Sequence, residues 1–351
     1  MDFDFTTHLS KLLSIPPSQI TIQVLTGGLL NAAVRASFTP PADFTRLGHL
    51  QSVRSVVLKY APPYMVSEPW VPLNTIRQDI EARALVLLDP NSESALPVSS
   101  LFTKYPNVKT PRLIHHDCKE RVLIMTDLGS SVVTLDDWLT QEPAPLPEDV
   151  EHIAKDLGRF LGEFVIATSK PNVGLLSQLP SNSALVHQFD GYVVNNLKVV
   201  LQGVPDVDIL TKCVEDAARD SRETDLCLGM VDIWRKNIVI DSDNNICLLD
   251  WEQFGWSNAS CEMSLLGMCS FTCVFFCLIL ILFLQNSPNN ALDLIENKFY
   301  GRCEESHQRV YKYHASELWT SSCRCPLSAL QTSSTCLLWS RDSQPSEMEC
   351  G

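Results

Sequence analysis

Two side chains that bind metal ions well, Asp232 and Asn237, lie five positions apart in the segment LGMVDIWRKNIVID, residues 228–241. The polar loop that carries them runs into a predicted strand. The turn-forming residues DSDNN follow, and a second short strand ends at Asp250. A hairpin that is symmetric about this turn would place Asn237 directly opposite Asp250.

Asn237 and Asp250 would then be close enough to share one metal ion. Cross-strand neighbours lie roughly 4.5 to 5.5 Å apart at Cα, and Mg²⁺ takes oxygen ligands at about 2.0 to 2.1 Å. One amide and one carboxylate form a thin protein shell, which suits Mg²⁺ completed by water and nucleotide phosphates. Asp232 would approach from the loop, and a carboxylate that binds no metal can accept a proton from a substrate hydroxyl. Together these groups fit phosphoryl transfer.

Two other interpretations compete with this one. Taken singly, each residue is compatible with an ordinary polar loop or strand end, so only the arrangement favours chemistry. The other is a calcium-binding EF-hand loop, because its ligand positions are matched by Asp241, Asp243, Asn245 and Glu252. That interpretation fails because Ile246 occupies the position that requires glycine, and because strands rather than helices are predicted on both sides.

The composition predicts a globular protein of two lobes or two small domains. The chain has 351 residues, of which 45% are hydrophobic and 19% charged. Its net charge of −14 argues against nucleic-acid binding through a basic face. The start MDFDFTTHLSKLL lacks the basic residues and long apolar core of a secretory signal, which predicts a cytoplasmic protein. The 13 cysteines show no repeated spacing and are expected to be free thiols.

The N-terminal half is predicted to form a five-stranded sheet. Runs of β-prone residues predict two strands within residues 20–38 and one each within residues 55–63, 110–117 and 120–130. The first two strands are joined through Gly27 and Gly28, which favour a tight loop, and the third ends at Lys59.

Helices are predicted where apolar residues recur at helical spacing. One covers residues 74–89, with Asn74 as its N-cap and Glu81 inside it. From about Leu135 the sequence becomes mostly helical. The helices predicted in this half lie around residues 135–141, 148–168, 187–203 and 206–223.

The sequence around the hairpin resembles a known family. MVDIWRKNIVI followed by LLDWE is similar to the catalytic loop and metal-binding segment of the aminoglycoside phosphotransferase and choline kinase family, small-molecule relatives of the protein kinases. That family's pattern is His-Gly-Asp, an asparagine five positions after the aspartate, and an Ile-Asp-Trp/Phe-Glu strand end. The resemblance implies that Asp232 is the catalytic base and that Asn237 and Asp250 hold Mg²⁺.

The N-terminal half matches the same family in order and spacing, so that the resemblance covers roughly residues 20–260. TGGLLNAAVR resembles the loop that covers the phosphates of ATP, and VVLKY resembles the strand whose lysine contacts them. MTDLG resembles the hinge, whose backbone groups hydrogen-bond adenine. The ATP-binding residues that the resemblance implies are Gly27, Gly28, Asn31, Lys59, its ion-pair partner Glu81, and the hinge residues Thr126, Asp127 and Leu128.

The resemblance implies an α+β, protein-kinase-like fold with two lobes. Residues 1–128 would form an N-terminal antiparallel sheet lobe, and residues 129–351 a mostly helical C-terminal lobe that contains the catalytic loop within 228–250. The implied activity is ATP- and Mg²⁺-dependent transfer of a phosphoryl group to the hydroxyl of a small molecule, by a fungal member of the family. The acceptor stays open, because members phosphorylate several classes of substrate.

Three residues depart from the family's pattern. Met230 and Val231 replace the histidine and glycine before the catalytic aspartate, and Arg235 stands where proline is common. The histidine mainly supports the loop in kinase-like folds, so a packed methionine can take its place. The departures leave a second hypothesis open, a nucleotide-binding relative without catalytic activity.

Residues 264–285, SLLGMCSFTCVFFCLILILFLQ, carry no charge and are long enough to span a bilayer as a helix. They stand where the resemblance predicts helices that complete the C-lobe. Three explanations stay open: a membrane anchor, a fully buried helix, and a translated intron, since codons for GMC and LQ can contain common fungal splice signals. Membrane contact is expected only if this run is a true span. The end of the tail shows no sustained helical or strand period, whereas residues 291–319 have the pattern of an amphipathic helix.

Overall fold

The computed structural model describes three long segments of the chain, residues 3–47, 52–169 and 226–259. It also describes the isolated positions 188, 191, 199, 208, 209, 211, 212, 215, 216, 219 and 266. All of them belong to one compact unit, Met1–Leu292. The predicted helices at 187–203 and 206–223, nearly all of the run 264–285, and the tail lie outside the described residues.

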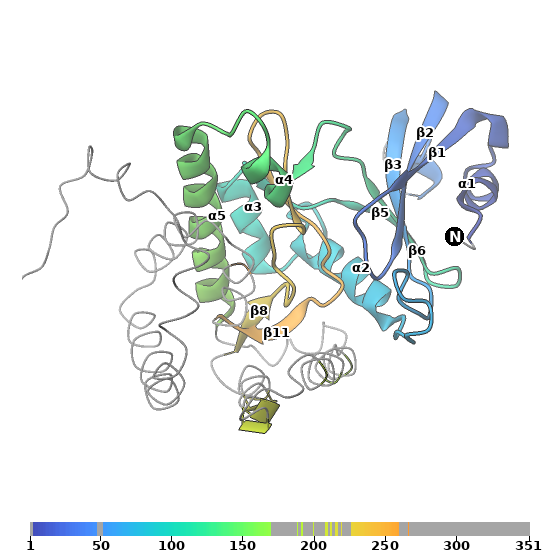
Figure 1. The fold of residues 1–351 in the computed structure, drawn as a ribbon. Helices are drawn as coiled ribbons and strands as arrows, with labels where there is room; N and C mark the ends of the chain where they lie inside the picture. The colour runs from blue at the N-terminus through green and yellow to red at the C-terminus, as the bar shows by residue number, and fades with distance from the viewer. Residues whose placement is uncertain are drawn as a thin grey trace, which may run out of the picture. The chain divides into compact units, whose positions relative to one another are not determined.

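The predicted five-stranded sheet is confirmed (Figure 1). Its strands run in the spatial order β1 (Ile20–Leu25), β2 (Ala32–Ala42), β3 (Val53–Tyr60), β6 (Val122–Thr126) and β5 (Leu113–Asp117). Every neighbouring pair is antiparallel. The sequence predicts these strands because their apolar residues alternate with polar ones or are β-branched.

The two faces of the sheet pack against different helices. Val56, Leu58 and Ile124 point to the face covered by α1 (Phe5–Leu13), while Leu123 and Met125 belong to the core that includes α2 (Ile76–Leu88). Successive side chains of a strand point to opposite faces. Lys59 follows Leu58 on β3, so its side chain lies on the α2 side.

The first helix was not predicted, although its N-cap is typical. Asp4 accepts a hydrogen bond from the Thr7 backbone N–H at 3.0 Å, as an N-cap side chain does. The predicted cap of α2 is wrong by one position, because the N-cap residue is Thr75. The Asn74 carboxamide nevertheless accepts a hydrogen bond from the Ile76 N–H at 3.0 Å, so it still orders the start of this helix.

The second half of the described chain combines helices with short strands. Its helices are α3 (Ser100–Lys104), α4 (Leu135–Thr140) and α5 (Pro147–Thr168), and the last two confirm predicted helices. A four-stranded sheet has the order β4 (Val108–Lys109), β10 (Ile246–Leu248), β9 (Ile238–Ile240) and β7 (Val133–Thr134). A separate two-stranded sheet pairs β8 (Leu226–Gly229) with β11 (Gly255–Asn258). Short 3-10 helices cover Pro17–Gln19, Thr45–Leu47 and Pro97–Ser99.

This arrangement of the described residues confirms the α+β, protein-kinase-like fold class. The boundary between lobes at residue 128 stays a prediction, two residues after β6 ends at Thr126.

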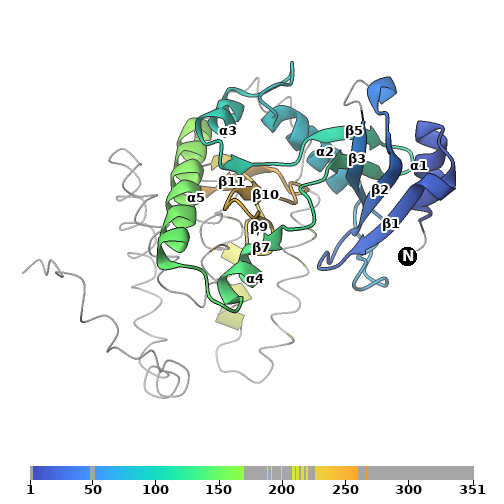
Figure 2. The ribbon, with the colours of Figure 1, turned by 90° about the horizontal axis from the view of Figure 1, so that it is seen from above.

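A row of aromatic rings connects the helices of this half to the segment after β10. Phe102 of α3 contacts Phe160 of α5, and the contacts continue through Phe164 to Trp251 and Phe254. The helices α3 and α5 accordingly lie side by side in both ribbon views (Figures 1 and 2). Because Trp251 is almost completely buried, the chain is firmly anchored immediately after Asp250.

The β9–β10 hairpin forms as predicted, but its register differs by one residue. Ile240 pairs with Ile246 and Ile238 with Leu248, so the residue opposite Asn237 is Leu249 and not Asp250. The Leu249 N–H donates to the Asn237 carbonyl at 2.8 Å. The reason is the turn, a three-residue loop that ends in Asn244 with a left-handed φ of 60°.

Within the described residues, no helix is both long and apolar enough to cross a membrane. That search does not reach the run 264–285, of which only Leu266 is described. The three described cysteines, Cys118, Cys227 and Cys247, are free thiols as predicted.

Candidate phosphotransfer site

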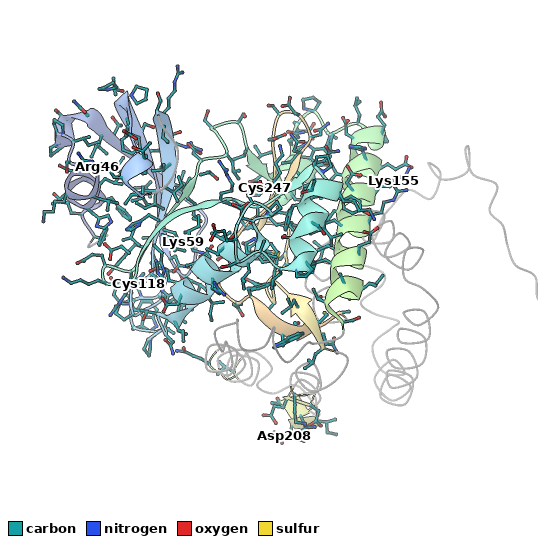
Figure 3. All side chains as sticks on the ribbon, turned by 180° about the vertical axis from the view of Figure 1, so that it is seen from behind. Arg46, Lys59, Cys118, Lys155, Asp208 and Cys247 are labelled. Atoms are coloured by element: carbon teal, nitrogen blue, oxygen red, sulfur yellow. The ribbon has the colours of Figure 1, made fainter. Side chains whose placement is uncertain are left out.

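Lys59 is the centre of a buried cluster of charges at the α2 side of the sheet (labelled in Figure 3). Its ammonium Nζ lies 2.6 Å from Glu81 Oε2 and 3.5 Å from Glu252 Oε2, and it donates a hydrogen bond to Asp250 Oδ1. The predicted Lys59–Glu81 pair is therefore present, with Asp250 at the same nitrogen. Burial alone would lower the pKa of Lys59, but the three carboxylates outweigh it and raise that pKa well above its usual value.

The carboxylates of this cluster are not fully compensated by cations. Burial raises the pKa of Glu81 to about 7, against the opposing effect of Lys59, and burial also raises the pKa of Glu252. Among the residues that the structure describes, three acids face two cationic side chains, Lys59 and Arg77. Glu252 Oε1 is buried and has no hydrogen-bond partner among the described residues. A cation bound here would neutralise charge that the protein leaves in place.

Asp250 reaches the lysine because the chain turns sharply after β10. Its backbone has a left-handed φ of 66°, an uncommon conformation for a residue with a side chain. The next residue is held on both sides, since Trp251 packs into the aromatic row and its indole Nε1–H donates to the Leu248 carbonyl at 3.1 Å. This anchored turn directs the Asp250 carboxylate toward Lys59.

Asp232 and Asn237 contact each other, as their spacing predicts. The Asn237 carboxamide donates from Nδ2 to the Asp232 carbonyl at 2.9 Å and to the Asp232 carboxylate at 3.2 Å. Because the amide nitrogen is directed at Asp232, the amide oxygen is the atom that remains on the opposite side of the carboxamide as a possible metal ligand. The corrected hairpin register places Asp250 one residue beyond the backbone partner of Asn237.

The structure shows the surroundings of the three residues that depart from the family's motif. Met230 and Ile233 are buried in the core on either side, so apolar packing holds this loop. Val231 has a left-handed φ of 65°, at the position where the family has glycine. Glycine adopts this conformation without steric cost, whereas valine is strained there. Arg235 forms an ion pair with Asp136 of α4, with Nη1 and Oδ1 3.1 Å apart.

The loop between β1 and β2 places Asn31 at the charge cluster. Gly27 has a φ of 108°, and a Cβ atom on Gly28 would lie 3.1 Å from the Asn31 carbonyl oxygen, so both positions favour glycine. The buried Asn31 carboxamide donates from Nδ2 to Glu252 Oε2 and accepts from Arg77 Nε at 3.0 Å. Sequence reasoning predicted Asn31 but missed the roles of Arg77 and Glu252 beside it.

The predicted hinge is fixed by an ion pair. Arg35 of β2 binds both oxygens of Asp127, with Nε–Oδ2 and Nη2–Oδ1 distances of 2.8 and 3.0 Å, and also donates to the Gly129 carbonyl. The Thr126 N–H donates to the Arg112 carbonyl at 3.0 Å, so that group is already occupied by the sheet. Adenine recognition thus stays a prediction for the carbonyl of Thr126 and for the backbone of Asp127 and Leu128.

The residues present fit a divalent cation. Carboxylate oxygens of Glu81, Asp250 and Glu252 lie within 4.8 Å of one another. Oxygen donors of this kind are what Mg²⁺ prefers. The orphaned Glu252 Oε1 and the excess of negative charge both favour a cation at this position.

The site combines a buried lysine–glutamate pair, an aspartate that follows a hairpin, and an Asp–Asn pair in the preceding loop. These are the parts by which kinase-like enzymes hold a nucleotide and position a hydroxyl for phosphoryl transfer. The fold and the site together define a small-molecule kinase with a hydroxyl acceptor, as the sequence predicts.

Comparison with curated proteins supports this class. No protein-family model matches the chain. The chain is similar to the 4-hydroxytryptamine kinase of Psilocybe cyanescens, with 27% identity over 286 residues, which covers 77% of this chain and 74% of that protein. The 4-hydroxytryptamine kinase of Psilocybe cubensis is 27% identical over 282 residues, covering 75% and 71%. The chain is thus a distant homologue of these fungal small-molecule kinases.

Solved structures that resemble the chain include two further kinases of small molecules. The ADP-bound aminoglycoside phosphotransferase APH(2'')-Ib has a TM-score of 0.48 and 15% identity, over 90% of this chain and 92% of that one. Choline kinase from Cryptosporidium parvum has a TM-score of 0.46 and 12% identity, over 80% and 78%.

Proposed function

We propose that the chain transfers the γ-phosphoryl group of ATP to the hydroxyl of a small molecule, and that it requires Mg²⁺. The observation that carries the proposal is the contact of Lys59 with Glu81 and Asp250, two residues from distant parts of the sequence. An isolated lysine–carboxylate pair is common, but a buried lysine shared by a helix glutamate and the aspartate after a hairpin is the arrangement that phosphoryl transfer needs.

Asp232 orients the acceptor hydroxyl and accepts its proton as the new O–P bond forms. The Asn237 carboxamide fixes this carboxylate by donating a hydrogen bond to it, so that the base is aimed before the acceptor arrives. Removing a positioned general base typically lowers the rate by about 10² to 10⁴.

Lys59 contacts the phosphates of the nucleotide, and Glu81 holds the ammonium in place. Asn237 and Asp250 would hold Mg²⁺, which when bound neutralises phosphate charge during the transfer. The glycines 27 and 28 let the β1–β2 loop approach the phosphates without a side chain between them. The backbone near Asp127, held by Arg35, would receive the adenine.

We propose an aromatic or amine-bearing alcohol as the first acceptor to test, because the homologues are named 4-hydroxytryptamine kinases. A cytoplasmic location is part of the same proposal.

The test is formation of ADP and of phosphorylated acceptor from ATP and Mg²⁺, with 4-hydroxytryptamine, choline and an aminoglycoside compared against ATP alone. We expect acceptor-dependent turnover that falls about 10² to 10⁴-fold in Asp232→Asn. The matched control is Asp243→Asn, an exposed acid in the hairpin turn, which should keep wild-type turnover.

Equal turnover in wild type and Asp232→Asn would refute the assigned base. Mg²⁺-dependent binding of ATP without turnover on any acceptor would favour the inactive relative, the hypothesis that Met230 and Val231 motivate.

A further inference from the structure

Arg77 is completely buried, although it stands near the start of α2, where arginine is usually exposed. Its guanidinium is bonded on all sides. Nη1 donates to the Asn74 carbonyl at 2.8 Å, and Nη2 donates to the Pro62 carbonyl at 2.6 Å. Nε donates to the Asn31 carboxamide oxygen at 3.0 Å. The side chain therefore joins α2 to the segment before it and to the β1–β2 loop.

The third direction of the network leads to the carboxylates clustered around Lys59. Asn31 links Arg77 to Glu252, because its amide nitrogen donates to Glu252 Oε2 while its amide oxygen accepts from Arg77. Arg77 Nε itself lies 3.9 Å from the same Glu252 oxygen, as its counter-charge. Within the described part of the chain the other oxygen of Glu252 has no hydrogen-bond partner, so Arg77 and Asn31 orient the carboxylate by one oxygen and leave the second available.

We propose that Arg77 is a positioning residue, which couples the β1–β2 loop to Glu252 and thereby sets the affinity of the site for magnesium-bound nucleotide. The inference deepens the proposed kinase function and rests on it. Arg77 reaches Glu252 through the Asn31 carboxamide and lies beside it as a counter-charge, so it acts through Asn31 and Glu252. An arginine suits this position because its planar guanidinium donates in three directions at once, which a lysine cannot do.

The test measures ATP binding by isothermal titration calorimetry, once with excess Mg²⁺ and once with EDTA. The ratio of the two dissociation constants is the gain in affinity that Mg²⁺ provides. We expect this gain to fall about tenfold in Arg77→Met and to be intermediate in Arg77→Lys, which keeps the charge. Arg54→Met is the control for loss of an arginine, because Arg54 is an exposed residue of β3.

A double-mutant cycle with Glu252→Gln shows whether Arg77 acts through Glu252. We expect the Arg77→Met/Glu252→Gln double variant to lose no more of the Mg²⁺ gain than Glu252→Gln alone. If the two losses multiply instead, or if folded Arg77→Met keeps the wild-type gain, the proposal is overturned. Should Arg77→Met fail to fold, the same cycle with Arg77→Lys decides by the same criteria.

The two proposals fail in different ways. If Mg²⁺ gives the wild-type chain no gain in ATP affinity, the proposed kinase function is refuted and this inference with it. If the wild-type gain is present but independent of Arg77, only the positioning role is refuted.

Discussion

Substitution of Val231 measures the backbone strain in the loop before Asp232. Its φ of 65° is a left-handed conformation that β-branched residues rarely adopt. Such a conformation costs about 1 to 3 kcal/mol when the surrounding structure enforces it. The surrounding structure holds Val231 in this conformation, because Met230 and Ile233 are both buried and fix the backbone on either side.

The expected effect of Val231→Gly is the sum of opposing contributions. Relief of strain stabilises by about 2 kcal/mol. The greater backbone freedom of glycine in the unfolded chain costs about 0.5 to 1 kcal/mol, and loss of a half-buried valine side chain costs about 1 kcal/mol. The net change in the free energy of unfolding should therefore lie close to zero.

Val57→Gly is the matched control. Val57 is also half-buried, but it lies in the middle of β3, where the backbone is extended and unstrained. The same side chain and the same backbone freedom are lost without any relief, so we expect a destabilisation of about 2 kcal/mol. The difference between the two variants isolates the strain at Val231.

The assay is equilibrium unfolding in urea, with the midpoint and the slope m determined for wild type and both variants. Equal destabilisation by Val231→Gly and Val57→Gly would show that the left-handed backbone stores no strain. A difference of about 2 kcal/mol would show that valine replaced glycine at a real cost in stability.

Two further predictions concern the hinge and the response to acid. Arg35→Lys loses the two-pronged contact with Asp127, so we expect KM for ATP to rise about tenfold with little change in kcat; an unchanged KM in steady-state kinetics would contradict the hinge assignment. Burial lowers the pKa of His8 and of His116, so each of these histidines binds more protons in the unfolded chain than in the folded one near pH 6.5. The stability that they contribute is lost as the pH drops through about 6.5, whereas the raised pKa values of Glu81 and Glu252 act in the opposite direction. The test is therefore the difference between wild type and His116→Gln in urea unfolding, in which the variant should lose less stability on acidification; an equal pH dependence would argue against a buried neutral His116.

The sheet could be predicted from the sequence because local patterns are sufficient for it. Runs of β-prone residues in β3 and β6, together with the glycine pair before β2, indicate the strands. The hairpin register could not be predicted as well. A polar turn such as DSDNN is compatible with loops of two or three residues, and only the left-handed Asn244 distinguishes them.

Arg77 was missed because the rule used for α2 assumes an apolar inward face. This helix directs Arg77, Gln78 and Glu81 inward, where they bind other polar groups of the core. On sequence evidence alone these residues look like a solvated helix surface. Their partners are far away along the chain, since Asn31 is 46 positions from Arg77 and Arg121 is 43 positions from Gln78. Only the folded chain brings the polar groups together.

The methionine before Val231 bears on whether the site is active. A histidine at that position would support the loop with hydrogen bonds, whereas Met230 supports it by packing into the core with Trp251 and α5. With methionine at this position the Asn237 carboxamide still donates to the carboxylate of Asp232, the proposed base. The altered motif therefore does not by itself imply a catalytically inactive protein. If ATP binds with Mg²⁺ and no acceptor is phosphorylated, the cause should be sought in acceptor binding, and restoring histidine by Met230→His should not rescue turnover.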